Sequence, residues 1–222
     1  TNGQNWYIAK VGSQIFDGNN YGTRIIQGDE TVKIPGPLIG STSIREYDVF
    51  GQTALIESSY GAFRVYRNHG GKWEFSHSLN EFSLPIREFE IDNSGCIWAA
   101  HMSKGLYKIE LSKDLKSIAR WQYYSSMPGT VSSGKMHVLN VRGRIVFSDG
   151  NCLYTYDDIK KRIITFHDLD NVCKKGVIST VNVDNKSFWL AHDDGYFLVH
   201  FNGRKYMSTA YIPNSIFGLE CN

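Results

Sequence analysis

Three basic side chains occupy matching positions in a set of short predicted strands. Arg45 and Arg87 stand at the same place in the segments SIREYDV and PIREFEI, and His137 takes that place in KMHVLNV. A guanidinium group is a planar fork of donors, which suits recognition of a carboxylate or a sulfate. An ion pair with Glu46, Glu88 or a neighbouring segment is the alternative, so a ligand-binding role and a structural role both stay open.

Two histidines follow tryptophans at matching places, in the segments WAAH and WLAH. Catalytic zinc requires three protein ligands, and no third ligand repeats with this pair. We therefore interpret His101 and His192 as hydrogen-bonded side chains at one rim of the fold, without a metal, and keep both as candidate ligand-binding residues. Trp98 and Trp189 are interpreted as a packing layer, and a sugar-stacking platform is the alternative.

Turns at the same rim carry further polar and aromatic side chains. Tyr60, Lys104 and Asp193 follow predicted second strands, and loops on a rigid scaffold often carry binding sites. This mixture suits a hydroxylated ligand. The sequence motifs of nucleophilic hydrolases, zinc proteases and nucleotide-binding loops are absent. We expect no catalytic residue, no cofactor and no enzyme activity.

One repeating unit supplies the elements that position these residues. The stretch PIREFEIDNSGCIWAAHMSKGLYKIEL alternates apolar and polar residues around a glycine-containing turn, which predicts three consecutive strands. Its first strand recurs with starts at residues 43, 85, 135, 177 and 215, which are 38 to 50 residues apart. Propeller blades repeat with a period of roughly 40–50 residues.

We therefore predict an all-β fold, a β-propeller of four-stranded blades with five repeats. Residues 6–10, 12–16 and 23–27 resemble second, third and fourth strands, whereas residues 215–222 resemble a first strand alone. Because open strand edges invite aggregation, the C-terminal strand is expected to complete the N-terminal blade. An open segment of a larger propeller is the alternative. The expected blades are 1–30 plus 215–222, 43–80, 85–124, 135–168 and 177–212.

Length and composition limit the function. A chain of 222 residues fits a single all-β domain. The 24 basic and 22 acidic residues give a net charge of +2, so we expect no nucleic-acid partner through this domain. No apolar run reaches 18 residues, so membrane contact is expected only through flanking segments of a longer protein from which this stretch is cut. The cysteines fit no zinc spacing and leave the disulfide state open. Three of them are interpreted as small apolar fillers on strands: Cys96, Cys152 and Cys221.

The segment FEIDNSGCIWAAHMSKGLYKIEL resembles the two-component regulator propeller repeat. That family pattern is an aspartate and glycine turn, then Ile-Trp, then a Gly-Leu-Tyr strand. The matching residues are Asp92, Gly95, Ile97, Trp98, Gly105, Leu106 and Tyr107. The segment GRIVFSDGNCLYTYDDIKKRIITF resembles later blades of the same family, and the resemblance extends over about three-fifths of the chain.

The resemblance implies a periplasmic sensor domain of a membrane regulator, such as the hybrid two-component systems of Bacteroidetes-like bacteria. It implies an oligosaccharide or another polar small molecule as ligand, and a homodimer as the working form. Two other classes remain open, a propeller enzyme acting on polysaccharide and a protein-interaction propeller. Thermal stabilisation by an oligosaccharide would favour the sensor, and a broad apolar patch would favour the interaction protein.

Overall fold

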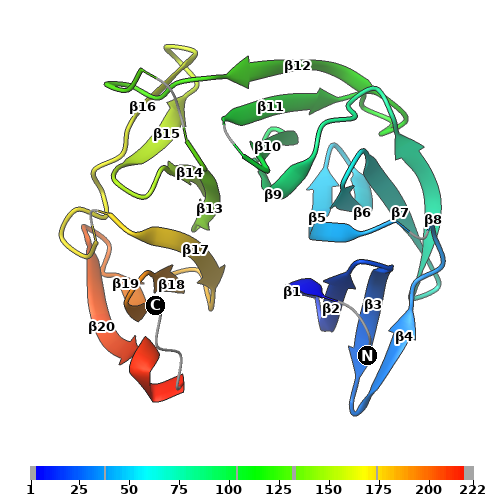
Figure 1. Ribbon diagram of the computed structural model, residues 1–222, viewed down its shortest axis with the longest axis horizontal. Helices are drawn as coiled ribbons and strands as arrows, with labels where there is room; N and C mark the ends of the chain where they lie inside the picture. The colour runs from blue at the N-terminus through cyan, green and yellow to red at the C-terminus, as the bar shows by residue number, and fades with distance from the viewer. Residues whose placement is uncertain (1–3, 38, 104, 132–133, 174, 218–222) are drawn as a thin grey trace. The chain divides into compact units, whose positions relative to one another are not determined.

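The computed structural model describes residues 4–37, 39–103, 105–131, 134–173 and 175–217. Within them the strands form five separate four-stranded antiparallel sheets, each built from four consecutive strands (Figure 1). A short 3-10 helix, η1 (Asn214–Phe217), follows the last strand. The described residues include no helix long and apolar enough to cross a membrane. The prediction of an all-β propeller with five four-stranded blades is confirmed.

The chain divides into two compact units, which we describe separately. The first unit holds three blades, with the strands β1 (Asn5–Val11), β2 (Gln14–Asn19), β3 (Gly22–Gln27), β4 (Glu30–Lys33), β5 (Ser41–Val49), β6 (Gln52–Ser59), β7 (Phe63–His69), β8 (Lys72–Leu79), β9 (Ile86–Ile91), β10 (Cys96–His101), β11 (Leu106–Leu111) and β12 (Ile118–Tyr124). The second unit holds two blades, with the strands β13 (His137–Val141), β14 (Arg144–Ser148), β15 (Leu153–Asp157), β16 (Arg162–Thr165), β17 (Val177–Asn182), β18 (Ser187–His192), β19 (Gly195–Phe201) and β20 (Tyr206–Pro213).

The first strands of neighbouring blades lie against one another. In the first unit β1 contacts β5 and β5 contacts β9, and in the second unit β13 contacts β17. Strands β5, β9, β13 and β17 begin within two residues of the positions expected from the repeat. The strand alternation and the period of the sequence therefore located four of the five first strands.

The expected composition of the N-terminal blade is wrong. This sheet has four strands of its own in the order β1-β2-β3-β4, all within residues 5–33. The segment at residues 6–10 is thus its first strand and not its second. Residues 215–217 belong to η1 and form no strand, and residues 218–222 lie outside the described part of the chain. Period-2 alternation looks the same in every strand of a blade, so it could not show which position in the blade each strand occupies.

The repeated aspartate of the family-like motif closes a hairpin turn. The Oδ1 atom of Asp92 accepts hydrogen bonds from the backbone nitrogens of Ser94 at 2.9 Å and Cys96 at 3.0 Å. Its Oδ2 atom accepts one from Nε1 of Trp98 at 2.9 Å. Gly95 completes the turn with a φ of 80°, in the left-handed region that favours glycine. This motif therefore has a structural role, since it connects a turn to the buried tryptophan of the next strand.

Aromatic residues fill the core between the second and third blades. Phe63 of β7 meets Phe89 of β9 edge-to-face, with ring centroids 5.4 Å apart. Phe82 lies on the connection between the two blades and packs against Phe63 at 5.9 Å and Tyr107 at 5.0 Å. All of these rings are buried. In the second unit a corresponding apolar cluster joins strands of the fourth and fifth blades.

Three of the four cysteines lie in the described part of the chain, and each is a free thiol. Cys96 is buried on β10, which agrees with the role of a small apolar filler, and desolvation raises the pKa of its thiol. The same expectation is wrong for Cys152, which is exposed in the turn before β15. Cys173 is partly exposed, and Cys221 is outside the described residues.

Candidate functional site

The turns between second and third strands lie at the same end of each blade as the connections between blades, and the contacts within each unit agree with this. In an up-and-down sheet, second-to-third turns and blade-to-blade connections lie at the same end. In the first unit, the backbone nitrogen of Met102 donates to the carbonyl of Pro85 at 3.1 Å. In the second, the nitrogen of Gly176 donates to the carbonyl of Gly150 at 2.7 Å. We call this end the polar rim of each unit, defined by the second-to-third turns and the connections between blades.

Tyr60 is the predicted site residue around which other side chains gather at the polar rim. Its ring meets the ring of Trp6 edge-to-face, with centroids 5.9 Å apart and planes at 82°. Nε1 of Trp6 donates to Oδ1 of Asn20 at 2.6 Å, and the hydroxyl of Tyr60 donates to the same oxygen at 3.3 Å. We call these three residues the rim aromatic cluster. They come from the start of β1, the β2–β3 turn and the β6–β7 turn.

The Tyr60 turn is held in place by its own backbone and by the preceding connection. The hydroxyl of Ser59 donates to the carbonyl of Ala62 at 2.9 Å, and the backbone nitrogen of Ser59 donates to the same carbonyl at 3.0 Å. A Cβ atom at Gly40 would overlap the Tyr60 ring. The ring therefore rests directly on the backbone of the connection, which only glycine allows at this distance.

Each of the two predicted arginine sites lies against a carboxylate. Nη2 and Nε of Arg45 contact Oε1 of Glu90, on the neighbouring blade, at 2.6 and 2.7 Å. Its Nη1 donates to the carbonyl of Ile44 at 2.7 Å. Desolvation acts to lower the pKa of Arg45, but the charge and hydrogen bond of Glu90, together with the charges of Glu88 and Tyr7, outweigh it and the pKa is raised. Nη2 of Arg87 lies 3.4 Å from Oε1 of Glu88, and burial lowers the pKa of Arg87. Both arginines thus have the carboxylate partners that the sequence left open.

The remaining predicted site residues are described strand by strand, each within its own unit. His101 lies at the end of β10, with its ring 6.2 Å from that of Tyr107. His137 is half-buried on β13, in the second unit, opposite Ser148. Lys104 lies outside the described residues.

His192 and Asp193 form part of the polar rim of the second unit. Nδ1 of His192 accepts a hydrogen bond from the backbone nitrogen of Asp194 at 3.0 Å. The backbone nitrogen of Asp193 donates to the carbonyl of Gly176 at 3.1 Å, and its carbonyl accepts a bond from Nδ2 of Asn214 at 2.8 Å. A Cβ atom at Gly176 would meet both side chains. These contacts connect the turn to the preceding connection, so both residues stabilise the rim.

The repeated tryptophans are in a packing environment. Trp98 is 1 % exposed, and Nζ of Lys108 lies 5.1 Å from its ring centroid. Trp189, at the matching place on β18, is half-buried. A buried ring offers no free face to a sugar, so the stacking alternative fails for Trp98.

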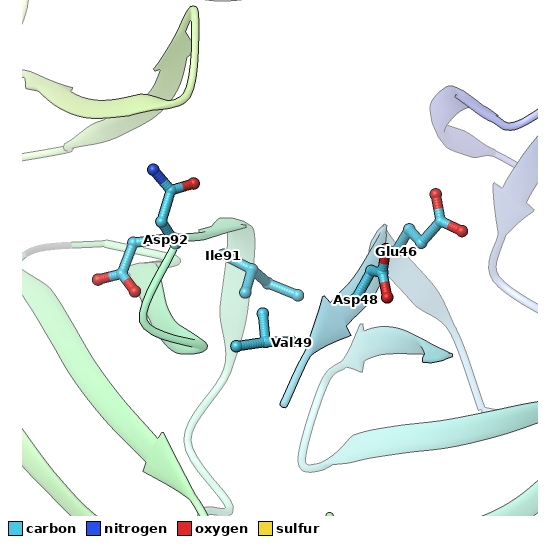
Figure 2. Close-up of a pocket in the computed structure, with 6 residues that line it drawn as sticks. Glu46, Asp48, Val49, Ile91 and Asp92 are labelled. Carbon is cyan, nitrogen blue, oxygen red and sulfur yellow. The ribbon is translucent and has the colours of Figure 1, made fainter. Parts of the chain in front are cut away.

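A pocket of about 260 Å³ lies at the end of the second and third blades opposite the polar rim. Its acidic wall is formed by Glu46, Asp48 and Asp92, and Figure 2 shows these carboxylates at the ends of β5 and β9. Among the described residues no group of three or more His, Cys, Asp and Glu side chains could hold a metal ion. Asp92 is already engaged in its hairpin turn. The acidic wall of the pocket is therefore in part structural.

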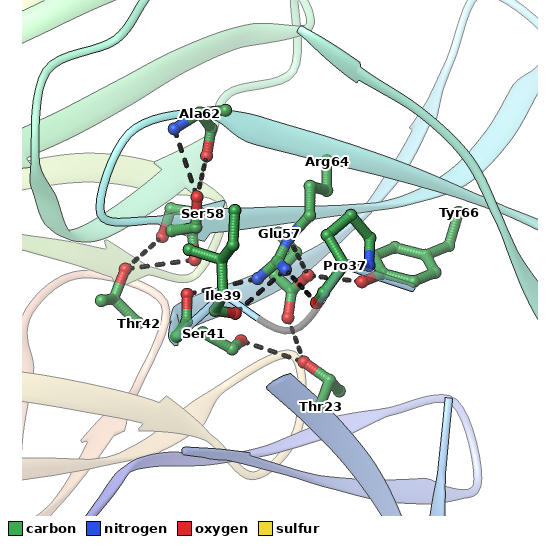
Figure 3. A network of polar contacts seen from close by, with 12 residues as sticks. Thr23, Pro37, Ile39, Ser41, Thr42, Glu57, Ser58, Ala62, Arg64 and Tyr66 are labelled. Carbon is green, nitrogen blue, oxygen red and sulfur yellow. Dashed lines mark hydrogen bonds and ion pairs between the residues drawn. The ribbon is translucent and has the colours of Figure 1, made fainter. Parts of the chain in front are cut away.

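A buried polar network lies beneath the polar rim of the first unit. Nε of Arg64 contacts Oε2 of Glu57 at 2.7 Å, and both side chains are almost fully buried. The same Oε2 accepts a hydrogen bond from the hydroxyl of Tyr66 at 2.6 Å, and Oε1 accepts one from the hydroxyl of Thr23 (Figure 3). Thr23 belongs to the first blade, whereas the other three residues belong to the second.

Arg64 also orders the connection between these two blades. Its Nη1 donates to the carbonyls of Pro37 and Ile39, each at 3.0 Å, and its Nη2 donates to the carbonyl of Gly40 at 3.2 Å. A buried charge is tolerated only when it is paired and hydrogen-bonded. Arg64 meets this condition, and through Gly40 it also positions the backbone beneath Tyr60.

Because of this network, the free energy of unfolding should fall as the pH rises into the alkaline range. The hydroxyl of Tyr7 joins the network through hydrogen bonds with the hydroxyls of Thr23 at 3.1 Å and Ser41 at 2.9 Å. Desolvation, followed by the nearby Glu57 charge, raises the pKa of both Tyr7 and Tyr66. The neutral phenols are therefore favoured in the folded state, and their contribution is complete below the unfolded pKa of about 10. Above that pH the free energy of unfolding should fall, by at most about 1.4 kcal/mol per pH unit for each tyrosine. Urea titrations at pH 8, 9, 10 and 11 would measure this slope.

A matched pair of variants separates these phenols from other groups that titrate in the same range. Tyr66→Phe should make the fall between pH 10 and 11 shallower than in the unsubstituted chain. Tyr21→Phe, which changes an exposed ring, should leave the slope unchanged. Equal slopes in all three proteins would contradict the assignment.

Sequence reasoning missed Trp6, Asn20, Glu57 and Arg64. A signal was present for the ion pair, because Glu57 and Arg64 interrupt apolar stretches on two strands of a predicted hairpin, and they are direct cross-strand partners. No comparable signal marks Trp6 or Asn20. These residues meet Tyr60 only because two blades pack side by side.

The fold and the rim define the class of this protein as a β-propeller with a polar and aromatic rim. No protein-family model and no curated protein matches the sequence. Among solved structures, the chain is similar to the propeller domain of Cps50 (Swd1) from Myceliophteria thermophila, with 10 % identity, a TM-score of 0.67, and coverage of 98 % of this chain and 74 % of that one.

Two further structures are extracellular domains of hybrid two-component systems from B. thetaiotaomicron. One has 13 % identity and a TM-score of 0.60, and the other has 17 % identity and a TM-score of 0.59. Each match covers 95 % of this chain but only 28 % of the matched chain. At such identities the likeness establishes the fold alone. The chain spans 28 % of the length of each of these extracellular-domain structures.

Proposed function

We propose that this chain is an extracytoplasmic ligand-sensing propeller domain of a bacterial signal-transduction regulator. The observation that carries the proposal is the likeness over 95 % of the chain to the extracellular domains of two hybrid two-component systems. The motif around Asp92 and Trp98, which resembles the two-component regulator propeller repeat, supports the same conclusion. The ligand we propose is an oligosaccharide or another polar small molecule, bound without a cofactor and without catalysis.

Such a domain works by differential binding. A ligand changes the output of a regulator only as far as it binds one state of the receptor more tightly than another. Rigid blades suit this task, because their loops keep a fixed geometry while the domain moves as a body. We propose that the working form is a homodimer and that flanking segments of the parent protein connect it to the membrane.

The test is a thermal-shift screen of this 222-residue chain. The panel contains neutral oligosaccharides, acidic oligosaccharides, and non-saccharide polar compounds such as dicarboxylic acids and amino acids. A ligand at 100 times its Kd stabilises the folded state by about 2.7 kcal/mol. For a domain of this size that corresponds to a rise in Tm of roughly 5–10 °C. A rise with any one class supports ligand sensing, and no shift with any class at millimolar concentration argues against it.

A further inference from the structure

We propose that the rim aromatic cluster, Trp6, Asn20 and Tyr60, is a binding platform for a neutral pyranose unit. The proposal rests on the proposed function and assigns it a site and a ligand chemistry. It places binding at the polar rim of the first and second blades, away from the acidic pocket and away from Arg45 and Arg87.

The aromatic part of the platform is exposed in a way that packing alone does not require. Trp6 is 37 % exposed and Tyr60 is 38 % exposed, although both rings contact each other. Aromatic rings combine a large apolar face with a polar group at one end. The apolar face of a pyranose, with its axial C–H groups, complements such a surface, and a nearly perpendicular pair of rings offers a face next to an edge.

The amide of Asn20 supplies the polar part of the platform. Nε1 of an indole can only donate, so the atom that accepts its bond at 2.6 Å must be the amide oxygen. That oxygen also accepts the Tyr60 hydroxyl, which occupies both of its lone pairs. The Nδ2 group donates to no side chain or backbone group among the described residues, and Asn20 is an exposed residue. Two N–H donors of fixed orientation therefore stand beside two aromatic rings, where they can bond a hydroxyl group of a sugar that stacks on the rings.

The platform is held rigid by the structure below it. Tyr60 rests on the backbone at Gly40, and the carbonyl of Gly40 accepts a bond from the buried Arg64. The turn that carries Asn20 is fixed by Asn19, whose Oδ1 accepts the backbone nitrogen of Tyr21 at 2.8 Å. A binding surface that is ordered in advance loses less entropy when a ligand binds.

The charge of the platform selects among saccharides. All three side chains are neutral, so binding should depend on stacking and on neutral hydrogen bonds. We therefore expect a neutral hexose or pentose oligomer to bind with an affinity that changes less than two-fold between 50 and 500 mM NaCl, because screening acts on charges. An acidic oligosaccharide of the same length should bind no better.

The experiment compares four variants with the unsubstituted chain by isothermal titration calorimetry. The probes are cellohexaose, maltohexaose, laminarihexaose, xylohexaose and mannohexaose. Trp6→Ala removes one ring, and Trp6→Phe restores an aromatic face. Asn20→Asp keeps the acceptor for both aromatic donors but removes the two amide N–H groups. Phe50→Ala is the control, because it removes a 64 % exposed aromatic ring at the opposite end of the second blade.

We expect at least one probe to bind, Trp6→Ala and Asn20→Asp to weaken it ten-fold or more, Trp6→Phe to recover most of the affinity, and Phe50→Ala to bind normally. Binding that survives both Trp6→Ala and Asn20→Asp would overturn the platform but leave ligand sensing intact. A thermal shift with only non-saccharide compounds would do the same. Loss of binding by Phe50→Ala together with the others would also count against a local site. If neither a saccharide nor any other compound stabilises the chain, both proposals fail.

Discussion

Replacing Arg64 with methionine is expected to lower the free energy of unfolding by about 3–5 kcal/mol. The substitution leaves the Glu57 carboxylate buried without its cation, and it removes the three hydrogen bonds that order the connection at Pro37, Ile39 and Gly40. Urea unfolding at pH 7, followed by tryptophan fluorescence, would measure the loss. This is the largest effect we expect from a single charged residue in the described part of the chain.

The double variant Glu57→Leu/Arg64→Met tests whether the loss comes from the unpaired charge. Because a buried pair is expensive to desolvate, removal of both charges should cost clearly less than removal of Arg64 alone. Arg120→Met is the matched control, since it breaks an ion pair with Glu110 at 2.8 Å on an exposed strand. Exposed pairs contribute about 0–1 kcal/mol. If Arg64→Met lowers the free energy of unfolding no more than Arg120→Met does, the buried network does not stabilise the fold as we expect.

Replacing Phe82 with alanine should destabilise the chain by about 3–5 kcal/mol. Phe82 is 1 % exposed, and its ring packs against Phe63, Tyr107 and Trp121, which belong to two blades. Loss of this ring opens a cavity at the blade interface that neighbouring strands cannot fill without breaking their ladders. The midpoint and slope of urea unfolding would report the change.

The exposed Phe50 provides the comparison for Phe82. Phe50→Ala should change the free energy of unfolding by less than about 0.5 kcal/mol, because the ring is on the surface. If Phe82→Ala and Phe50→Ala have similar effects, the connection between the second and third blades is not part of the core.

The repeat could be predicted because it is encoded locally. Alternation, turn glycines and spacing near Pro85–Leu111 were sufficient to predict strands, their approximate limits and the number of blades. The first blade was wrong because residues 6–10 alternate as any strand does. Their place in the sheet depends on which neighbour they pair with, and residues 5–11 pair with β2 alone within a sheet of four.

The candidate site could be predicted only in part. Topology correctly placed Tyr60 at a shared rim, and an ion pair was correctly kept as the alternative for Arg45. Of the three alternatives, the neighbouring blade supplies the partner: the carboxylate is Glu90 and not Glu46 or Glu88, because register and side-chain direction across two blades select it. The contact of Trp6 and Asn20 with Tyr60 could not be predicted, because no sequence pattern connects residues this far apart in the chain.

By itself the sequence determined the all-β class, the five-fold repeat and the rim to which its loops belong. These follow from interactions between residues close in the chain, namely period-2 burial and tight turns. The tertiary structure alone decided the assembly of the first blade, the Glu57–Arg64 network and the grouping of Trp6, Asn20 and Tyr60. Each of these depends on side chains from different strands or blades meeting at hydrogen-bonding or van der Waals distance, which only packing in three dimensions brings about.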